Sequence, residues 1–264
     1  PKGLPGKALF LDRDGVIIED EERIAIDPHS KKIVADKIFV SHAHSDHVNI
    51  GARNPATYFM SPPTHGLIAQ KIPKAALFHR MEQKTTMQGK IHKICLENSG
   101  HILGSSQVVV EGEKKVCVTT DFKLQDSILQ KGAEIIPCDT LVIESTFGLK
   151  QFSFPSRESV YGEMEAWIRS AQKSNHLAIL AGYATGKAQE LTKIVNEYST
   201  ATPFVHDSIF DKNKIHDSFA SSLGDYVKID HNLHEAEVLI LPPSLCAPSV
   251  LHALSVSARK PVVS

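Results

Sequence analysis

The sequence predicts an α/β protein in two parts, a β-rich first part followed by an alternation of strands and helices. In the first part, short apolar runs follow one another with few helical stretches, which is typical of a partly antiparallel sheet. After about residue 150, apolar strands alternate with stretches of helical length, which indicates a parallel α/β layer. With 264 residues, the chain is long enough for one large domain or two modest ones.

The first part is expected to hold eight strands and little helix. The first two strands flank Arg13-Asp14-Gly15, in which Asp-Gly is a hairpin turn signal. A short helix is expected at residues 64–71. Another is expected to open at Asp46 and His47, after a strand that ends at residue 40. The expected strands cover residues 7–12, 16–19, 23–26, 37–40, 91–96, 107–111, 114–119 and 140–143.

The second part is expected to begin near residues 148–156, where Gly148 and Pro155 interrupt the pattern. The first domain is therefore assigned to residues 1–150 and the second to residues 151–264. The expected helices of the second part cover residues 157–173, 187–198, 213–221 and 249–255, and its strands cover residues 176–181, 203–206, 238–241 and 261–263.

The composition is that of a globular protein, with 42% hydrophobic residues, 22% charged residues and a formal net charge of -1. The charge is distributed unevenly, because between residues 48 and 96 the only acid is Glu82 among seven Lys or Arg residues. This local excess fits the footprint of a polyanion, and it fits equally well a solvated basic face balanced by acids from elsewhere.

The four cysteines are far apart and form no C-x-x-C, which indicates buried free thiols in a reducing compartment. No signal peptide and no apolar run of membrane-spanning length is visible. A cytoplasmic location without membrane contact is therefore expected, and a homodimer is a further expectation.

The strongest chemical signal is the run Ser41-His42-Ala43-His44-Ser45-Asp46-His47, directly after an apolar strand. Imidazole and carboxylate groups are ligands that suit zinc, and a loop leaving a strand can aim several of them at one point. The polar residues Asp27, His101, Asp121 and Glu144 also stand at strand ends or in turns beside strands. Strand ends on a rigid sheet hold ligands well, so these side chains are candidates for the same site.

These segments resemble the metallo-β-lactamase fold and, more narrowly, its β-CASP branch, which contains nucleases of RNA and DNA. The third match has the G-H-x-L-G form common among RNA 3′-end-processing enzymes, and the last has Lys in place of Arg. The matches, in family order, are Asp27, His42-Ala43-His44-Ser45-Asp46-His47, Gly100-His101-Ile102-Leu103-Gly104, Thr120-Asp121-Phe122, Glu144-Ser145-Thr146-Phe147-Gly148 and Gly186-Lys187-Ala188-Gln189-Glu190-Leu191.

The resemblance implies a metallo-β-lactamase αββα sandwich that carries the metals, with a small parallel α/β β-CASP domain inserted in it. It also implies two zinc ions. His42, His44 and His101 would hold the first ion, Asp46 and His47 would help to hold the second, Asp121 would bridge both, and Asp27 would support the ligands.

The implied activity is zinc-dependent hydrolysis of phosphodiester bonds in single-stranded nucleic acid by a metal-bridging hydroxide. The expected partner is single-stranded RNA or DNA, with RNA favoured over DNA. Enzymes of mRNA 3′-end processing and exonucleases are the nearest functional class. Asp46 and Glu144 are the catalytic candidates, with Glu144 supporting the group that neutralises the leaving oxygen.

Lys187 is the candidate for substrate binding, because it opens a helix whose N-terminus could meet a phosphate. A solvated lysine explains its position equally well. The preceding glycines do not form a P-loop, since only three residues separate Gly182 from Gly186 and Ala188 replaces the Ser or Thr that binds magnesium.

The family pattern requires two more histidines downstream of the inserted domain, and no late histidine of this chain lies in a matching motif. We therefore expect the segment that returns to the first domain to be missing from this sequence. Two functions remain as alternatives to the nuclease. One is a small-molecule zinc hydrolase of the thioesterase or lactonase type, and the other is a catalytically impaired nucleic-acid-binding subunit. A third interpretation, a phosphatase using Asp12 and Asp14, is disfavoured because more short strands follow.

Overall fold

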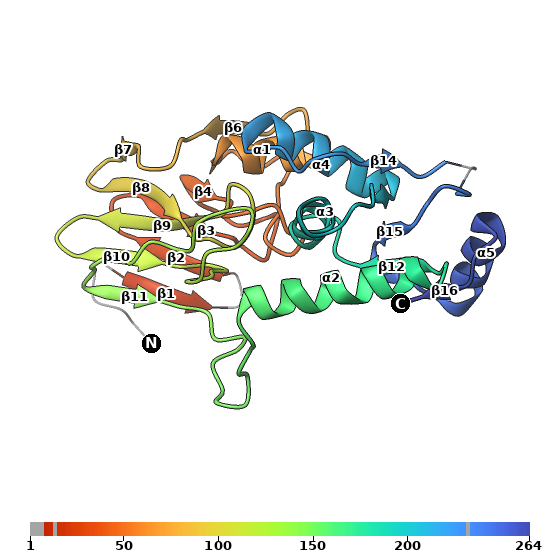
Figure 1. The fold of residues 1–264 in the computed structure, drawn as a ribbon. Helices are drawn as coiled ribbons and strands as arrows, with labels where there is room; N and C mark the ends of the chain where they lie inside the picture. Colours follow the sequence, from red (N-terminus) through yellow and green to blue (C-terminus); the bar gives the residue numbers. More distant parts are fainter. Residues whose placement is uncertain (1–7, 13–14, 231–232) are drawn as a thin grey trace. The chain divides into compact units, whose positions relative to one another are not determined.

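The computed structural model describes residues 8–12, 15–230 and 233–264, and the chain forms two compact units (Figure 1). Unit 1 comprises the residues up to 126 together with 130–146, and unit 2 comprises residues 127–129 and 147–264. Each unit is built around its own sheets and core, as described below. No helix within the described ranges is long and apolar enough to cross a membrane.

The first sheet of unit 1 has six strands in the order β1-β2-β3-β4-β5-β6. Its first three strands are antiparallel, and the pairs from β3 to β6 are parallel. The predicted hairpin strands pair as expected, while Arg13 and Asp14 of the turn lie outside the described residues. The strands are β1 (Ala8–Asp12), β2 (Gly15–Glu19), β3 (Arg23–Ile26), β4 (Lys37–Phe39), β5 (Thr57–Met60) and β6 (Leu77–Arg80).

The second sheet of unit 1 has the order β11-β10-β9-β8-β7 and is antiparallel except for the pair β10 and β11. The expectation of one meandering sheet is thus refined to two mixed sheets. The strands are β7 (Thr86–Gln88), β8 (Lys93–Asn98), β9 (Ser106–Glu111), β10 (Lys115–Val118) and β11 (Thr140–Val142).

The two sheets share one apolar core, because alternate side chains of both turn toward it. Ile24, Ile26 and Phe39 come from the first sheet, and Ile94 and Val108 come from the second. All five are at most 1% exposed. Burial of this many branched and aromatic side chains makes the sheets a rigid support for whatever their ends carry.

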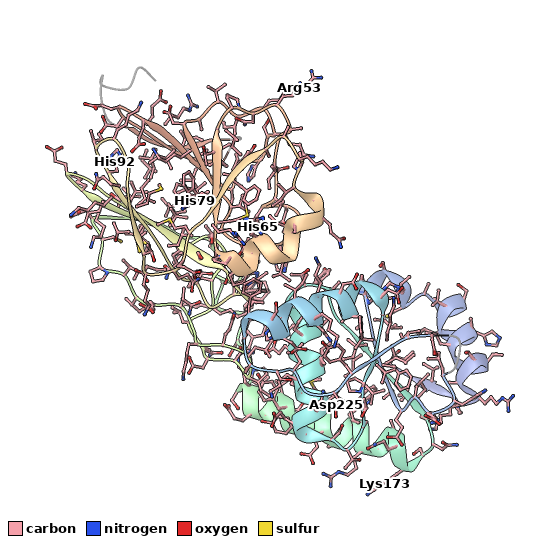
Figure 2. The ribbon with its side chains drawn as sticks, turned by 90° about the horizontal axis from the view of Figure 1, so that it is seen from above. Arg53, His65, His79, His92, Lys173 and Asp225 are labelled. Atoms are coloured by element: carbon pink, nitrogen blue, oxygen red, sulfur yellow. The ribbon has the colours of Figure 1, made fainter. Side chains whose placement is uncertain are left out.

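Helix α1 (Pro62–Ile68) follows β5 and continues into a 3-10 turn at Ala69–Lys71, where the sequence predicted a helix. Ser61 caps it by accepting a hydrogen bond from the backbone of Thr64, and a proline at its start fits the first turn. Figure 2 shows His65 on this helix and His79 on β6. The expected helix at Asp46 and His47 is wrong, because residues 45–47 form a turn followed by irregular chain.

Unit 2 is built on a parallel sheet in the order β14-β13-β15-β12-β16, which confirms the predicted parallel α/β layer. Its strands are β12 (Leu177–Ala181), β13 (Phe204–Val205), β14 (Val227–Lys228), β15 (Val238–Leu241) and β16 (Val262–Val263). Its helices are α2 (Arg157–Lys173), α3 (Lys187–Tyr198), α4 (Asp207–Phe219) and α5 (Pro248–Ala258), with a 3-10 turn at Pro243–Leu245.

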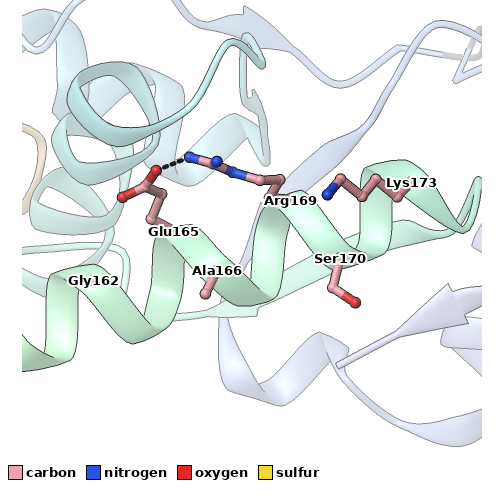
Figure 3. A pocket seen from close by; sticks show the side chains of 6 residues that line it. All are labelled: Gly162, Glu165, Ala166, Arg169, Ser170 and Lys173. Atoms are coloured by element: carbon pink, nitrogen blue, oxygen red, sulfur yellow. Dashed lines mark hydrogen bonds and ion pairs between the residues drawn. The ribbon is translucent and has the colours of Figure 1, made fainter.

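Local sequence explains where these helices begin. Ser156 caps α2 by accepting a hydrogen bond from the backbone of Ser159, and Glu165 and Arg169 form an ion pair one turn apart on its surface (Figure 3). Helix α4 begins six residues before its predicted start at residue 213, because the side chain of His206 caps it through the backbone of Ser208.

The thiols are free, but the prediction that all four are buried is wrong in part. Only Cys117 is buried, and the other three are half-buried. Burial raises the pKa of the Cys117 thiol to about 11, which keeps it protonated and unreactive. Phe147 and Phe154 do not lie in the core, since they are 61% and 67% exposed and pack edge to face.

Candidate metal centre

The ends of the strands in unit 1 bring together two overlapping groups of metal-ligand side chains. The first group is His42, His44, His101 and Asp121, and the second is Asp27, His42 and His47. Within each group, all ligand atoms lie within 4.8 Å of one another. Because β3 and β4 are parallel, their carboxyl ends meet at one edge, and this places Asp27 beside the histidine segment.

Four of the six distances between ligand atoms of the first group are close to those of a tetrahedral metal site. His44 Nδ1 lies 3.1 Å from the Nε2 atoms of both His42 and His101. Asp121 Oδ2 lies 3.6 Å from His42 Nε2 and 3.4 Å from His101 Nε2. Ligands about 2.0–2.1 Å from a zinc ion in tetrahedral geometry are separated by roughly 3.4 Å, so the four atoms fit around one ion.

Hydrogen bonds alone cannot account for this convergence. His44 Nδ1 faces two ring nitrogens, and a ring nitrogen carries either one proton or one lone pair. One of the two contacts would therefore lack a well-directed hydrogen bond. A cation in the middle would accept a lone pair from each ring, which makes this the chemistry that the donor set fits best.

Ser41 fixes which nitrogen of His42 faces the centre. Ser41 Oγ has one proton, and it donates this proton to Oδ2 of Asp27, which as a carboxylate can only accept. Ser41 Oγ must then accept from Nδ1 of His42, 2.9 Å away. This leaves the lone pair of His42 Nε2 directed at His44 and Asp121.

Asp27 also orients His47. Its Oδ2 accepts from Nδ1 of His47 at 2.7 Å, and its Oδ1 accepts from the backbone of Ser41 at 2.8 Å. The Nε2 of His47 then lies 3.5 Å from Asp121 Oδ1 and 3.6 Å from Asp46 Oδ2. Asp121 thus presents one carboxylate oxygen to the first group and the other to His47.

The local electrostatics favour neutral rings at His42 and His101. Burial, with the charges of His47 and His101, lowers the pKa of His42 far below its usual range. Burial and the neighbouring His44 lower the pKa of His101 to about 3. Burial alone would also lower the pKa of His47, but the hydrogen bond and charge of Asp27 outweigh it and raise that pKa to about 9.

Unusual backbone conformations aim several of these groups. Asp27 has a φ of 45°, and Thr120, just before Asp121, has a φ of 54°. Non-glycine residues rarely adopt such angles, and they occur where the fold holds a functional group in place. Gly100 has a φ of 68°, and a Cβ there would lie 2.5 Å from the carbonyl oxygen of Lys123, so the turn before His101 requires glycine.

The remaining predicted site residues differ in their placement. Asp46 is 79% exposed, with Oδ2 close to His47. Glu144 follows β11 and accepts a hydrogen bond from the backbone of Thr146 at 2.7 Å. Lys187 belongs to unit 2, where its Nζ lies 2.8 Å from Glu190 Oε2 at the start of α3.

A hollow of about 250 Å³ adjoins the second group. Its polar lining includes Asp27, His47, Asp121 and Glu144, and its apolar lining includes side chains of β2, β3, β10 and β11. Glu144 is near enough to Asp121 for its charge, after burial, to raise the pKa of that carboxyl group. The carboxylates that line the hollow therefore share one partly apolar environment.

Sequence reasoning did not single out Ser41 or Ser105. Ser41 is fully buried and links Asp27 to His42, and its position directly before the first histidine was the available signal. Ser105 Oγ accepts hydrogen bonds from the backbone of His101 and Ile102, both at 3.1 Å. It thereby fixes the turn that presents His101.

Comparison with curated proteins gives relatives that match most of this chain. It is 30% identical over 220 residues to a probable DNA ligase of Opitutus terrae, covering 78% of this chain and 20% of that protein. It is 29% identical over 198 residues to the transcription termination factor FttA of a Lokiarchaeum species, covering 62% of this chain and 31% of that protein.

A third relative is RNase aCSPSF2 of Saccharolobus solfataricus, which is 28% identical over 202 residues, covering 64% of this chain and 40% of that protein. The chain thus spans less than half the length of each of these three relatives. No protein-family model matches the sequence.

Proposed function

Because FttA and RNase aCSPSF2 are β-CASP nucleases of the metallo-β-lactamase fold, as the motifs of this chain predicted, we propose that the chain is the metal-binding part of such a nuclease. Its reaction is hydrolysis of phosphodiester bonds in single-stranded RNA. The observation that carries the proposal is the convergence of three ring nitrogens and Asp121 at tetrahedral spacing.

The proposed cofactor is a pair of zinc ions. His42, His44 and His101 would hold the first ion, Asp46 and His47 would help to hold the second, and Asp121, which faces both sets of histidines, would contribute to both. When bound, the ions would lower the pKa of a shared water and neutralise charge on the phosphate. Asp27 and Ser41 would orient the rings, a role that supporting residues often have in zinc sites.

In this proposal unit 1 is a metallo-β-lactamase αββα sandwich and unit 2 is a β-CASP domain, corresponding to the sequence division at residues 150 and 151. Glu144 lies at the hollow beside Asp121 and would hold the group that serves the leaving oxygen. Lys187, half-exposed at the start of α3, would meet a phosphate of the substrate.

The test combines elemental analysis with cleavage of end-labelled single-stranded RNA and DNA by the same sample. We expect about two zinc ions per chain, and metal-dependent cleavage of RNA in preference to DNA. Asp46→Ala should abolish cleavage while circular dichroism stays unchanged, because an exposed carboxylate is removed from the reacting site and no core residue is touched. Ser45→Ala, an exposed neighbour, is the matched control.

Two other outcomes would contradict the proposal and favour one of the alternative functions. Turnover of a thioester that is insensitive to salt, without cleavage of nucleic acid, would favour the small-molecule hydrolase. Salt-dependent RNA binding with no cleavage by a zinc-loaded sample would favour the binding subunit.

A further inference from the structure

We propose that a second surface of unit 1, formed by His65, Phe78 and Arg80 and called here the α1–β6 face, binds one base and one phosphate of single-stranded RNA. The inference rests on the proposed nuclease function and adds a place where the substrate is held beyond the metal centre. The sequence did not suggest an aromatic and basic platform, because the stacked partner of Phe78 is His65, on a different element.

The aromatic part of the face is a stacked pair of rings. His65 on α1 and Phe78 on β6 have ring centroids 4.5 Å apart and an interplanar angle of 29°. Phe78 remains 44% exposed, although β6 pairs along its length with β5. An exposed, already stacked aromatic ring offers a flat surface to an unpaired base, and stacking of this kind accepts any base.

The basic part is Arg80, two residues further along β6. Since side chains alternate along a strand, Phe78 and Arg80 emerge on the same side of the sheet, with Leu77 and His79 on the other. Arg80 is exposed and has no ion-pair partner among the described residues. Burial and the charge of Arg80 lower the pKa of His65, so the ring pair stays neutral while the guanidinium supplies the positive charge.

Helix α1, which carries His65, is hydrogen-bonded to the turn that presents His101. Ser61, the cap of α1, donates to the carbonyl oxygen of Gly104 at 2.6 Å, and Thr64 donates to the same oxygen at 3.0 Å. Gly104 ends the turn that presents His101. Arg80 pairs in register with Met60 at the end of β5, so it lies at the carboxyl ends of the parallel strands, as the centre does.

The surrounding charge favours a polyanion as the occupant. Lys71 and Lys74, in the connection from α1 to β6, are also exposed and have no ion pair within the described ranges. A single aromatic pair beside an unpaired arginine matches a base and its phosphate, since backbone contacts supply affinity and stacking adds to it. Three of the seven basic residues in the excess noted in the sequence, Lys71, Lys74 and Arg80, thus lie in the segment that runs from the end of α1 to β6.

The experiment measures binding of a fluorescent 12-nucleotide single-stranded RNA at several salt concentrations, with all proteins carrying Asp46→Ala to prevent cleavage. Phe78→Ala should weaken binding about tenfold, within the range for loss of one stacked base, and Phe78→Tyr should retain it. Arg80→Gln should make the plot of log affinity against log salt shallower by about 0.7, the value for one phosphate contact on a single strand.

Two matched controls should bind as the parent does. Leu77→Ala removes an apolar side chain that is 59% exposed on the opposite side of β6, and Arg53→Gln removes an exposed arginine from the loop before β5. Loss of binding in Leu77→Ala equal to that in Phe78→Ala would overturn the proposal. So would parent-like binding by both Phe78→Ala and Arg80→Gln, and this result would leave the nuclease function standing if the protein with Asp46 intact cleaves RNA. If the parent neither binds nor cleaves RNA, both proposals fall.

Discussion

The hydroxyl proton of Ser41 determines which ring nitrogen of His42 faces the metal centre. Ser41 gives its proton to Asp27, which forces His42 to donate from Nδ1 and to leave Nε2 free for a metal. Removal of the hydroxyl leaves all metal ligands in place but releases the ring orientation of His42. Ser41→Ala should therefore weaken zinc binding about 10- to 100-fold, the usual cost of losing a supporting hydrogen bond.

Competition with a chromophoric zinc chelator would measure this change. Ser45→Ala serves again as the control, because Ser45 is exposed and its side chain forms no hydrogen bond with the rings in the described structure. Equal zinc affinities in the two variants would show that Ser41 does not set the orientation of His42.

Glu144 provides the second test at this scale. Its charge acts on Asp121 across the hollow, so it is placed to act on the reacting groups rather than to anchor substrate. Glu144→Gln should lower kcat about 100-fold with little change in KM, because neutralisation of the leaving oxygen matters in the transition state. Glu111→Gln, a surface acid of β9, should leave both constants unchanged. A rise in KM that accounts for the whole loss of kcat/KM would assign Glu144 to substrate positioning.

The sequence predicted candidate ligands correctly as a group where they lie close together along the chain. The segment from His42 to His47 could be identified because all four groups lie in one loop after a strand. The bond from Ser41 to Asp27 could not be predicted, because it depends on side-chain directions at the ends of two parallel strands. The α1–β6 face was missed for the same reason.

At the scale of elements, periodicity located the long helices and most of the buried strands, but it missed the buried strand β5 and the exposed strand β6. Helices α2 and α3 have the predicted bounds, since their apolar spacing is regular and their starts carry clear signals. Strand β6 was not predicted, because all four of its side chains are exposed and only pairing with β5 makes it a strand. Strand β5 was also not predicted. Its two aromatic residues favour a strand, but the apolar run is short and two prolines follow soon after it.

The packing of α3 against α4 makes a prediction about pH. His216 on α4 is 3% exposed, and its Nδ1 has no hydrogen-bond partner within the described part of the chain. Burial lowers its pKa, although Asp217 opposes and Lys193 reinforces the shift. The folded protein therefore keeps this ring neutral, while the unfolded chain takes up a proton near pH 6.5.

The sign of the pH effect follows from that difference. The contribution of His216 is complete above about pH 6.5 and is lost as the pH falls, because the unfolded state then binds more protons. Unfolding in urea should show a loss of about 1–2 kcal/mol between pH 7 and pH 5 that His216→Gln largely removes. His176→Gln, at a partly exposed histidine of the same unit, is the matched control. Equal slopes in the parent and in His216→Gln would contradict the assignment.

At the scale of the whole molecule, the change in sequence pattern near residue 150 coincided with two kinds of sheet in the structure. Unit 1 ends at residue 146 and unit 2 also takes residues 127–129, because that short segment packs with α2, where the backbone of Ile128 donates to the Tyr161 hydroxyl. The local sequence pattern does not predict that this short segment belongs to unit 2, since its placement depends on a contact between distant parts of the chain. The assignment of the units to named domains stays a prediction.

The location of the centre in one unit leads to a prediction about stability. Its ligands come from the loops after β3, β4 and β10 and from the turn between β8 and β9, so a bound ion would tie both sheets of unit 1 together. A ligand at 100 times its dissociation constant stabilises the state that binds it by about 2.7 kcal/mol. Zinc should therefore raise the melting temperature of unit 1 by roughly 5–10 °C, and a chelator should reverse the shift.

His101→Ala removes a metal ligand that belongs neither to the apolar core nor to unit 2, so this variant should lose the response to zinc. His92→Gln changes a buried histidine of unit 1 that lies outside the centre, so this variant should retain the response. Differential scanning calorimetry distinguishes the two units, because only the transition of unit 1 should move, and a zinc response that survives in His101→Ala would place the ion elsewhere.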